Sequence, residues 1–300
     1  MNQNKLYVVC NSDWGAPDKI LVYNAATIRA ASAGTLTISP TKTITSGDFS
    51  SLIGIAFDSS NDLWVASNGN NDVLELTAAQ LATATPAAIV SLSNSPGSPA
   101  GLAFDADGSL WVTGEFAGGI LLNFTTDQFG TGADATPRYC AVTQPQGGIC
   151  ISQANLFLEP EGVAVFNGGV WVANNSTTGS NELDGATPGR QLVNLAVVGG
   201  DLTVKGIYGT VVPDTGGTAT SPFLCPGGLF ATGVNLWVND ESYGEATPQC
   251  GANGDSASQT GGVFSFTSAE LMSEPATQAP TFTNVTGRPG FGGVYVENDR

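Results

Sequence analysis

The 300-residue chain contains no histidine, and only 12% of its residues are charged. The lack of histidine excludes Ser-His-Asp triads and histidine-based zinc sites, and it removes the usual general base at neutral pH. Any site must therefore be built from carboxylates, amides and backbone carbonyls. These oxygen ligands suit Ca²⁺ or Mg²⁺ better than transition metals.

Long apolar runs are missing as well. A membrane span needs about 18 consecutive apolar residues, and no stretch of this chain reaches that length. No signal peptide is expected at Met1, because the polar residues Asn2–Lys5 lead directly into an apolar stretch. If the protein is exported, the numbered chain is expected to be the mature form.

Basic residues are scarce, with nine Lys and Arg against 26 Asp and Glu, so the net charge is −17. No cluster of basic residues occurs. Such a surface repels phosphate backbones, and nucleic acid is therefore not an expected partner. The simplest interpretation of the charge is solubility, and metal cations or cationic partners are the alternative.

Short alternating stretches separated by turns dominate the rest of the sequence, which is rich in glycine and proline. The segment Gly101-Leu-Ala-Phe-Asp-Ala-Asp-Gly-Ser-Leu-Trp-Val-Thr113 predicts two short strands around an Asp-Gly turn. Close copies begin at Gly54, Gly162 and Gly228. A fifth copy is complete only if the ends are joined, with Gly293–Arg300 supplying the first strand and Lys5–Val9 the second.

Each copy continues into two further predicted strands, which makes the unit a four-stranded meander. The spacings between the repeat glycines at 54, 101, 162, 228 and 293 are 47, 61, 66 and 65 residues, as in propeller blades with long loops. We therefore predict an all-β chain whose residues 1–300 form a single five-bladed β-propeller, closed by pairing of the N- and C-terminal strands. A six-bladed ring is the alternative. The predicted outer strands are Lys19–Tyr23 and Thr41–Thr45, Val73–Leu76 and Ala88–Leu92, Gly119–Phe124 and Arg138–Val142, two strands within Gln191–Val212, and Gly262–Phe266 and Thr281–Val285.

Five cysteines allow two predicted disulfides. Cys140 and Cys150 bracket a loop-like run, and Cys225 and Cys250 flank one repeat, so each pair can meet, with Cys10 left over. Two disulfides indicate an oxidising compartment, and an extracellular or periplasmic location is therefore expected. Five reduced cysteines remain the alternative.

Aromatic residues occupy one fixed position in the second strand of every repeat: Tyr7, Trp64, Trp111, Trp171 and Trp237. The simplest interpretation is packing between blades rather than ligand stacking. Asp58, Asp105 and Asp107 fall in the turns between first and second strands. Aspartate in such turns usually hydrogen-bonds its own turn, and these residues are assigned no chemistry.

Polar residues also recur where the second strands end. Four residues after each aromatic residue stand Asn11, Asn68, Glu115, Asn175 and Glu241, and the positions just before include Asn174 and Asp240. In a propeller these loops meet on one face, together with the segments that lead into the first strands. Glu161 is the only charged residue in those segments. The candidate metal ligands for Ca²⁺ or Mg²⁺ are thus Glu161, Asn175, Asp240, Glu115 and Glu241, whereas the alternative is that these side chains only cap strand ends.

The repeat Gly-Leu-Ala-Phe-Asp-x-x-Gly-x-Leu-Trp-Val at 101–112 resembles that of NHL-type propellers and of SMP-30/gluconolactonase-like proteins. The enzymes of the second group hold one divalent metal at the channel mouth. That resemblance implies that Glu161, in a Glu-Gly pair, is a metal ligand, with Asn175 and Asp240 as similar-looking partners. The family's glutamate is found near the chain start, whereas Glu161 lies in mid-chain.

Three functions remain open. The first is an exported, non-enzymatic propeller that acts as a binding or surface-assembly module through its face loops, with a protein, small molecule or glycan as ligand and with no catalytic residue assigned. The second is a metal-dependent lactonase-like hydrolase, in which the cation would activate water. The third is a purely structural subunit of a larger extracellular array formed by self-assembly.

Overall fold

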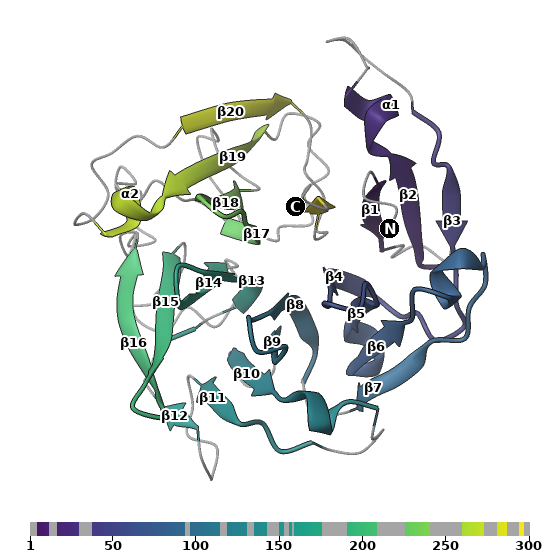
Figure 1. Ribbon diagram of the computed structural model, residues 1–300. Helices are drawn as coiled ribbons and strands as arrows, with labels where there is room; N and C mark the ends of the chain where they lie inside the picture. The colour runs from purple at the N-terminus through teal and green to yellow at the C-terminus, as the bar shows by residue number, and fades with distance from the viewer. Residues whose placement is uncertain are drawn as a thin grey trace, which may run out of the picture.

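The computed structural model is a ring of five sheets, arranged around a central axis as the five blades of a β-propeller (Figure 1). The predicted all-β class and the five blades are confirmed, and the six-bladed alternative is wrong. In the part of the chain that is described, no helix has the length and apolar character needed to cross a membrane. The structure describes residues 5–11, 17–29, 38–93, 97–114, 119–130, 135–142, 150–152, 156–157, 159–175, 191–208, 226–240, 260–272, 281–286 and 294–296.

Every blade has its first strand next to the ring axis and its outer strands toward the rim (Figure 1). Blade 1 contains β21 (Val294–Val296), β1 (Lys5–Cys10), β2 (Lys19–Asn24) and β3 (Lys42–Ile44). Blade 2 contains β4 (Leu52–Phe57), β5 (Leu63–Ser67), β6 (Asp72–Leu76) and β7 (Ile89–Ser93). Blade 3 contains β8 (Pro99–Phe104), β9 (Leu110–Gly114), β10 (Ile120–Phe124), β11 (Tyr139–Val142) and β12 (Ile151–Ser152). Blade 4 contains β13 (Glu159–Phe166), β14 (Gly169–Asn175), β15 (Gln191–Val198) and β16 (Asp201–Tyr208). Blade 5 contains β17 (Pro226–Ala231), β18 (Asn235–Asp240), β19 (Thr260–Thr267) and β20 (Thr281–Thr286).

The two ends of the chain close the ring within blade 1, as predicted. β21 pairs antiparallel with β1, and the register places Tyr7 opposite Tyr295 and Val8 opposite Val294. Figure 1 shows both ends beside each other next to the axis. Because the C-terminal strand completes the sheet that the N-terminal strand begins, backbone hydrogen bonds rather than side-chain packing alone join the first and last parts of the ring.

A β-bulge interrupts the inner strand of each of blades 2 to 5 at the repeat glycine. In β13 the register shifts between Pro160 and Val163, and the shifts in β4, β8 and β17 fall at the matching positions. At Gly101 and Gly162 the glycine faces backbone of the next blade. A Cβ added at Gly101 would overlap the carbonyl oxygen of Glu161 and would lie 2.8 Å from the backbone nitrogen of Val163. The repeat glycine is therefore required because neighbouring inner strands approach backbone to backbone.

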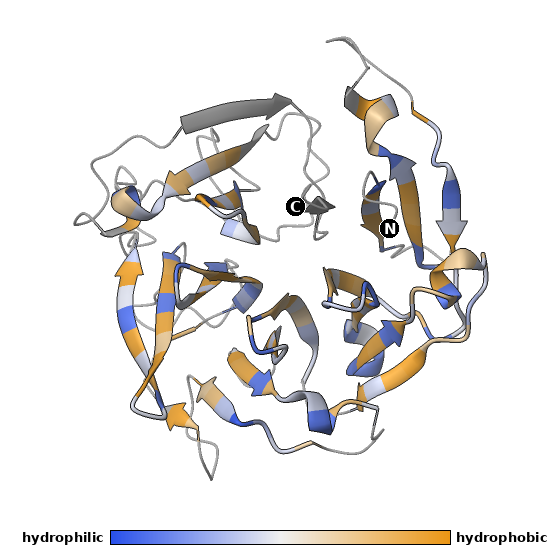
Figure 2. Ribbon diagram, viewed as in Figure 1, coloured by the Kyte–Doolittle hydropathy of each residue, from blue (hydrophilic) through white to orange (hydrophobic). Residues whose placement is uncertain are grey.

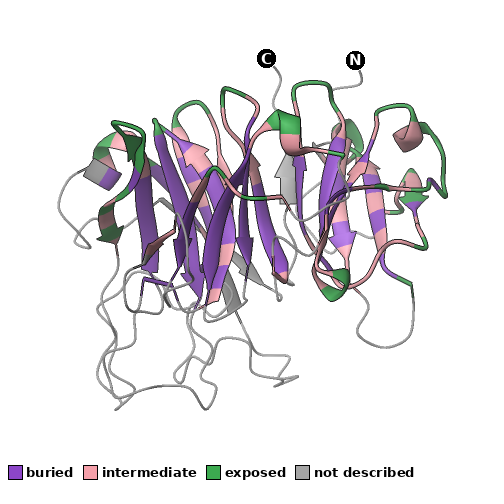
Figure 3. Ribbon diagram, turned by 90° about the horizontal axis from the view of Figure 1, so that it is seen from below, coloured by how far each residue is buried: buried purple, intermediate pink, exposed green. Residues whose placement is uncertain are grey.

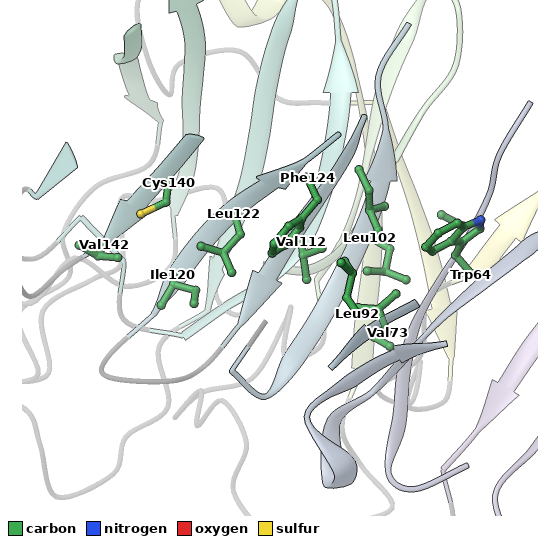
Figure 4. Close-up of a cluster of buried hydrophobic side chains, with 13 residues drawn as sticks. Trp64, Val73, Leu92, Leu102, Val112, Ile120, Leu122, Phe124, Cys140 and Val142 are labelled. Carbon is green, nitrogen blue, oxygen red and sulfur yellow. The ribbon is translucent and has the colours of Figure 1, made fainter. Parts of the chain in front are cut away.

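The aromatic repeat position packs between blades, as expected. Tyr7, Trp64, Trp111 and Trp171 are buried, each in a cluster that contains residues of the following blade, whereas Trp237 is half-buried. Figure 4 shows the cluster between blades 2 and 3, to which blade 2 contributes Trp64 and blade 3 contributes Phe124. Hydrophobic residues predominate along several of the coloured strands (Figure 2), and β5, β9 and β10 are buried at every position. From the side, burial follows the strands and exposure follows the turns (Figure 3).

The turn aspartates bind the tryptophan indoles as well as their own turns. The Asp105 carboxylate accepts hydrogen bonds from the backbone N–H of Ser109 (3.0 Å) and from the Trp111 indole Nε1 (3.0 Å). Asp58 accepts from Trp64 Nε1 in the same way (3.1 Å). These contacts give the indole N–H groups hydrogen-bond partners. The structural interpretation of the turn aspartates is therefore confirmed for Asp58 and Asp105.

One helical turn stands between the third and fourth strands of several blades. Between β6 and β7 the chain forms a 3₁₀ helix at Gln80–Ala82, where sequence analysis predicted only the strands Val73–Leu76 and Ala88–Leu92 on either side. Thr77 N–H and its hydroxyl both donate to Gln80 Oε1, so the side chain of the first helical residue binds the residue three positions before it. The same Thr-x-x-Gln/Glu motif recurs in blades 3 and 5. The corresponding elements are the 3₁₀ helix Thr126–Gln128 and α2 (Ser268–Met272), and α1 (Ala25–Arg29) occupies the same place in blade 1. A further 3₁₀ helix, Asn68–Asn70, lies between β5 and β6 of blade 2.

The predicted disulfide between Cys140 and Cys150 is present, with the two Cα atoms 4.5 Å apart. It holds β12 beside β11, and this parallel pair was not predicted from the sequence. Beyond β12, Leu156 and Phe157 are fully buried in the cluster shared by blades 3 and 4. The disulfide thus anchors the segment that fills the space between these blades. The other expected pair, Cys225 and Cys250, lies outside the described residues.

Replacing both Cys140 and Cys150 by serine is expected to lower the free energy of unfolding by about 3 kcal/mol, because the unfolded chain regains the freedom of a short closed loop. Urea unfolding would measure the loss. Cys10→Ser is the matched control, since Cys10 is a free thiol. Dithiothreitol should destabilise the wild type more than the double variant, which no longer has this disulfide to lose. Equal midpoints for the double variant and Cys10→Ser would contradict the role of this disulfide.

Candidate functional site

One face of the ring carries the starts of the inner strands, the β-bulges and the ends of the second strands; we call it the bulge face. In blade 4 Pro160 pairs with Asn174, and in blade 5 Pro226 pairs with Asp240. Blades 2 and 3 place Ser67 and Gly114 in the equivalent position. The segments that sequence analysis placed on one face therefore do lie together in the described blades.

Glu161 and Asn175 form a hydrogen-bonded pair on this face. Asn175 Nδ2 donates to Glu161 Oε1 at 2.9 Å. The bulge in β13 places Glu161 just beside Pro160, and Asn175 ends β14 directly opposite Glu159. Glu161 is partly exposed, whereas Asn175 is fully buried. Two of the five candidate ligands are thus brought into contact by the register of one strand pair.

The buried Asn175 side chain also holds an acceptor that is not satisfied. Its Oδ1 atom is buried and, within the described structure, has no hydrogen-bond partner. A buried amide oxygen in this state costs free energy unless a ligand, a cation or water supplies a partner. Amide and carboxylate oxygens are ligands that Ca²⁺ and Mg²⁺ prefer, so these two residue types fit a divalent cation, while the contact that the structure shows between them is made by the Asn175 amide nitrogen.

The remaining candidate ligands are not all described. The backbone of Asp240 lies on the bulge face opposite Pro226, and nothing is assigned to its side chain. Glu115 and Glu241 lie outside the described residues. Within the described ranges no group of three or more Asp, Glu, Cys or His side chains converges on one point. The described part of the site therefore consists of one carboxylate and its amide neighbour.

Blade 2 shows the capping role that sequence analysis gave as the alternative. The Ser67 hydroxyl is fully buried and makes hydrogen bonds to both the N–H and the carbonyl of Ser50, each at 3.1 Å. Asn68 Nδ2 donates to the Pro99 carbonyl of blade 3 at 3.4 Å. Here the polar side chains bind the loop backbone, unlike Asn175, which binds a carboxylate. In blade 1 the same strand end carries the free thiol of Cys10, whose pKa burial raises above its usual value.

Thr113 contacts the site and was not identified from the sequence. It is fully buried, its hydroxyl accepts a hydrogen bond from Gly101 N–H at 2.8 Å, and it donates to the backbone carbonyl of Glu161. The equivalent positions, two residues after each aromatic, hold Val9, Ala66, Ala173 and Asn239. Sequence analysis could have identified Thr113 because it carries a hydroxyl at a repeat position that is apolar in three of the other four blades.

The opposite face has a different character. There the Asp107 carboxylate forms an ion pair with Arg138 at 3.4 Å. Hydrogen bonding with Asp105 and Ser109 holds the pKa of Asp107 far below its usual range, and burial raises the pKa of Asp105. Asp105 and Asp107 interact with each other, and Asp107 also pairs with Arg138, so both aspartates keep the structural role expected of them.

Comparison with known proteins gives similarity of fold. No protein-family profile and no curated protein sequence matches the chain significantly. Similar solved structures include the PQQ-bound aldose sugar dehydrogenase of Streptomyces coelicolor, with 16% identity, a TM-score of 0.49, and coverage of 84% of this chain and 73% of that one. A streptogramin B lyase matches with 12% identity, a TM-score of 0.45, and coverage of 96% and 70%. A chain of a nidogen/laminin complex matches with 13% identity, a TM-score of 0.41, and coverage of 88% and 90%. At these identities and TM-scores the matches assign neither an activity nor a functional residue to this chain.

Proposed function

We propose that the protein is a non-enzymatic binding module whose ligand site lies on the bulge face at Glu161 and Asn175. The observation that carries this proposal is the 2.9 Å hydrogen bond between Asn175 Nδ2 and Glu161 Oε1, made beside a buried amide oxygen that has no hydrogen-bond partner among the described residues. Binding residues are commonly found at strand ends and loops that a rigid scaffold positions, and the paired strands β13 and β14 position these two side chains.

The chemistry of the pair indicates which ligands it can bind. A carboxylate offers hydrogen-bond acceptors, and one oxygen of Glu161 already accepts from the Asn175 amide. The unsatisfied Asn175 oxygen is likewise an acceptor. Ligands that fit are therefore hydrogen-bond donors, such as the hydroxyls of a glycan or the ammonium groups of a basic peptide. The net charge of −17 favours the approach of cationic ligands in the same way.

The Cys140–Cys150 disulfide supports a location outside the cytoplasm, since disulfides of this kind form and persist in oxidising compartments. We therefore propose that the module works after export, in extracellular or periplasmic space, where glycans and secreted proteins are available as ligands.

Glu161→Gln is expected to weaken binding about tenfold or more on an array of immobilised oligosaccharides and basic peptides, since a charge-assisted hydrogen bond contributes about 1.5–3 kcal/mol. Asp107→Asn is the matched control, because it removes the same charge from the opposite face. Binding that Glu161→Gln leaves intact, or that Asp107→Asn reduces equally, would place the site elsewhere. Absence of any wild-type signal on the array would contradict a glycan- or peptide-binding role.

The second candidate is a metal-dependent lactonase-like hydrolase, favoured by the fit of Glu161 and Asn175 to an oxygen-preferring cation. Glu161 and Asn175 would hold the ion, with Asp240, Glu115 and Glu241 as the further candidate ligands. A bound divalent cation polarises a carbonyl and activates water. Calorimetric titration with Ca²⁺ and a pH-stat assay on simple lactones test this candidate. Ca²⁺ binding and lactone hydrolysis that are both lost in Glu161→Gln would favour it over the binding module.

A further inference from the structure

Thr113 of blade 3 reaches across the blade boundary to the residue that carries the site's carboxylate. Its buried hydroxyl accepts from Gly101 N–H at 2.8 Å and donates to the Glu161 backbone carbonyl. The same carbonyl lies against the bare Cα of Gly101, where a side chain would overlap it. The Glu161 backbone is thus held from one side by a neighbouring blade, while Asn175 holds its side chain from within blade 4.

The other described blade boundaries lack this hydrogen bond. At the boundary of blades 2 and 3 the bulge carbonyl of Ala100 packs against Gly54, and at that of blades 4 and 5 the carbonyl of Gly227 packs against Gly162. Ala66 and Ala173 occupy the positions equivalent to Thr113, and alanine has no side-chain donor. Among these three boundaries, only that of blades 3 and 4 has a hydroxyl at this position, that of Thr113, and only there is the bulge residue charged, namely Glu161. Ring closure alone therefore does not require it.

We propose that Thr113 is a positioning residue for the Glu161–Asn175 pair: by holding the Glu161 backbone carbonyl, its hydroxyl sets where the carboxylate lies relative to Asn175. This inference rests on the proposed function of that pair as a ligand site. A fixed carbonyl restricts the peptide unit on the C-terminal side of Glu161, and with it the direction in which the side chain leaves the bulge. Preorganised ligand groups bind more tightly because less conformational freedom is lost on binding.

The test compares wild type, Thr113→Val, Thr113→Ala and Thr113→Ser with Ser91→Ala as matched control. Ser91 is a fully buried hydroxyl in blade 2 that donates to Glu75 at 2.8 Å, away from the bulge face. Valine and alanine both occur at the equivalent positions of other blades, so the fold accommodates either. The readout is the side-chain NH₂ signal of Asn175 in protein labelled with ¹⁵N-asparagine and kept in chelator, assigned by its loss in Asn175→Ala.

We expect Thr113→Val and Thr113→Ala to shift this signal and to speed its exchange with D₂O about tenfold, because the Asn175–Glu161 hydrogen bond opens more often. Thr113→Ser should restore wild-type behaviour, and Ser91→Ala should leave the signal in place. If the Asn175 signal is unchanged in both Thr113→Val and Thr113→Ala, the positioning role is wrong. A purely structural role would lower stability in these variants and in Ser91→Ala alike, without moving that signal.

Binding on the same oligosaccharide and peptide array separates this inference from the proposed function. Loss of binding in Glu161→Gln with full binding in Thr113→Val would overturn the positioning role and leave the ligand site standing. A shifted Asn175 signal in Thr113→Val, in a protein whose wild type binds no arrayed probe, would support the positioning role and contradict the proposed function. We expect Thr113→Val to weaken binding about tenfold and Thr113→Ser to retain it.

Discussion

Deleting residues 294–300 is expected to remove most of the stability of the ring, on the order of 5 kcal/mol or more. The deletion takes away β21, which pairs with Leu6, Tyr7 and Val8 and is the inner strand of blade 1. Without it β1 becomes an open edge next to the axis, and the backbone hydrogen bonds that join the C-terminal part of the ring to blade 1 are lost. Urea unfolding followed by tryptophan fluorescence would measure the effect.

A circular permutant is the control for this deletion. It joins Arg300 to Met1 through a flexible linker and opens the chain between Gly199 and Gly200, the exposed turn of the β15–β16 hairpin. Because it keeps the pairing of β21 with β1, we expect it to unfold within about 1–2 kcal/mol of the wild type. A deletion variant as stable as this permutant would show that the terminal strand does not close the ring.

Gly101→Ala and Gly162→Ala are expected to destabilise the protein by about 3 kcal/mol or more, a large effect for one methyl group. The new Cβ at Gly162 would overlap the carbonyl oxygen of Gly227 and lie 2.7 Å from the backbone nitrogen of Leu229. These atoms belong to the backbone of the neighbouring inner strand, which cannot swing aside as a flexible side chain would. Relief therefore requires two blades to move apart.

Gly47→Ala is the matched control, since Gly47 is exposed and a Cβ there meets nothing within 4 Å. Its free energy of unfolding should stay within about 0.5 kcal/mol of the wild type. Thermal unfolding of the three variants measures the difference. Similar midpoints for Gly101→Ala and Gly47→Ala would mean that the blade boundary is more loosely packed than the structure indicates.

Much of the architecture follows from the repeat, because each recurring residue type meets one structural requirement of its own position. Glycine recurs where inner strands approach, and tryptophan recurs where blades pack; at Trp64 and Trp111 an aspartate meets the indole N–H. In blade 4, whose turn is one residue shorter, Trp171 Nε1 donates instead to the Phe166 carbonyl at 3.3 Å. These constraints act over a few residues or between adjacent blades, so the spacing of the motif was sufficient to predict the blade number and the shared terminal blade.

Features that depend on contacts between distant segments were not predicted. β12 pairs with β11 because the Cys140–Cys150 disulfide holds it there, and its two residues carry no strand pattern of their own. The helical turns were overlooked because the hydrogen bonds of Thr77 and Thr125 to the glutamines three residues later resemble ordinary turn chemistry in sequence. Thr113 was overlooked because its partners, Gly101 and the Glu161 carbonyl, lie in different strands and different blades.

The amino-acid sequence by itself determined the five blades, the strand exchange between the two ends and the one disulfide that is described, since each is encoded in a repeated or paired local pattern. Only the tertiary structure decided which polar residues on the bulge face meet. Five loops offer chemically similar amides and carboxylates, and periodicity treats them as equivalent. Register and bulge geometry distinguish them: they place Asn175 against Glu161, and they turn Ser67 and Asn68 toward backbone.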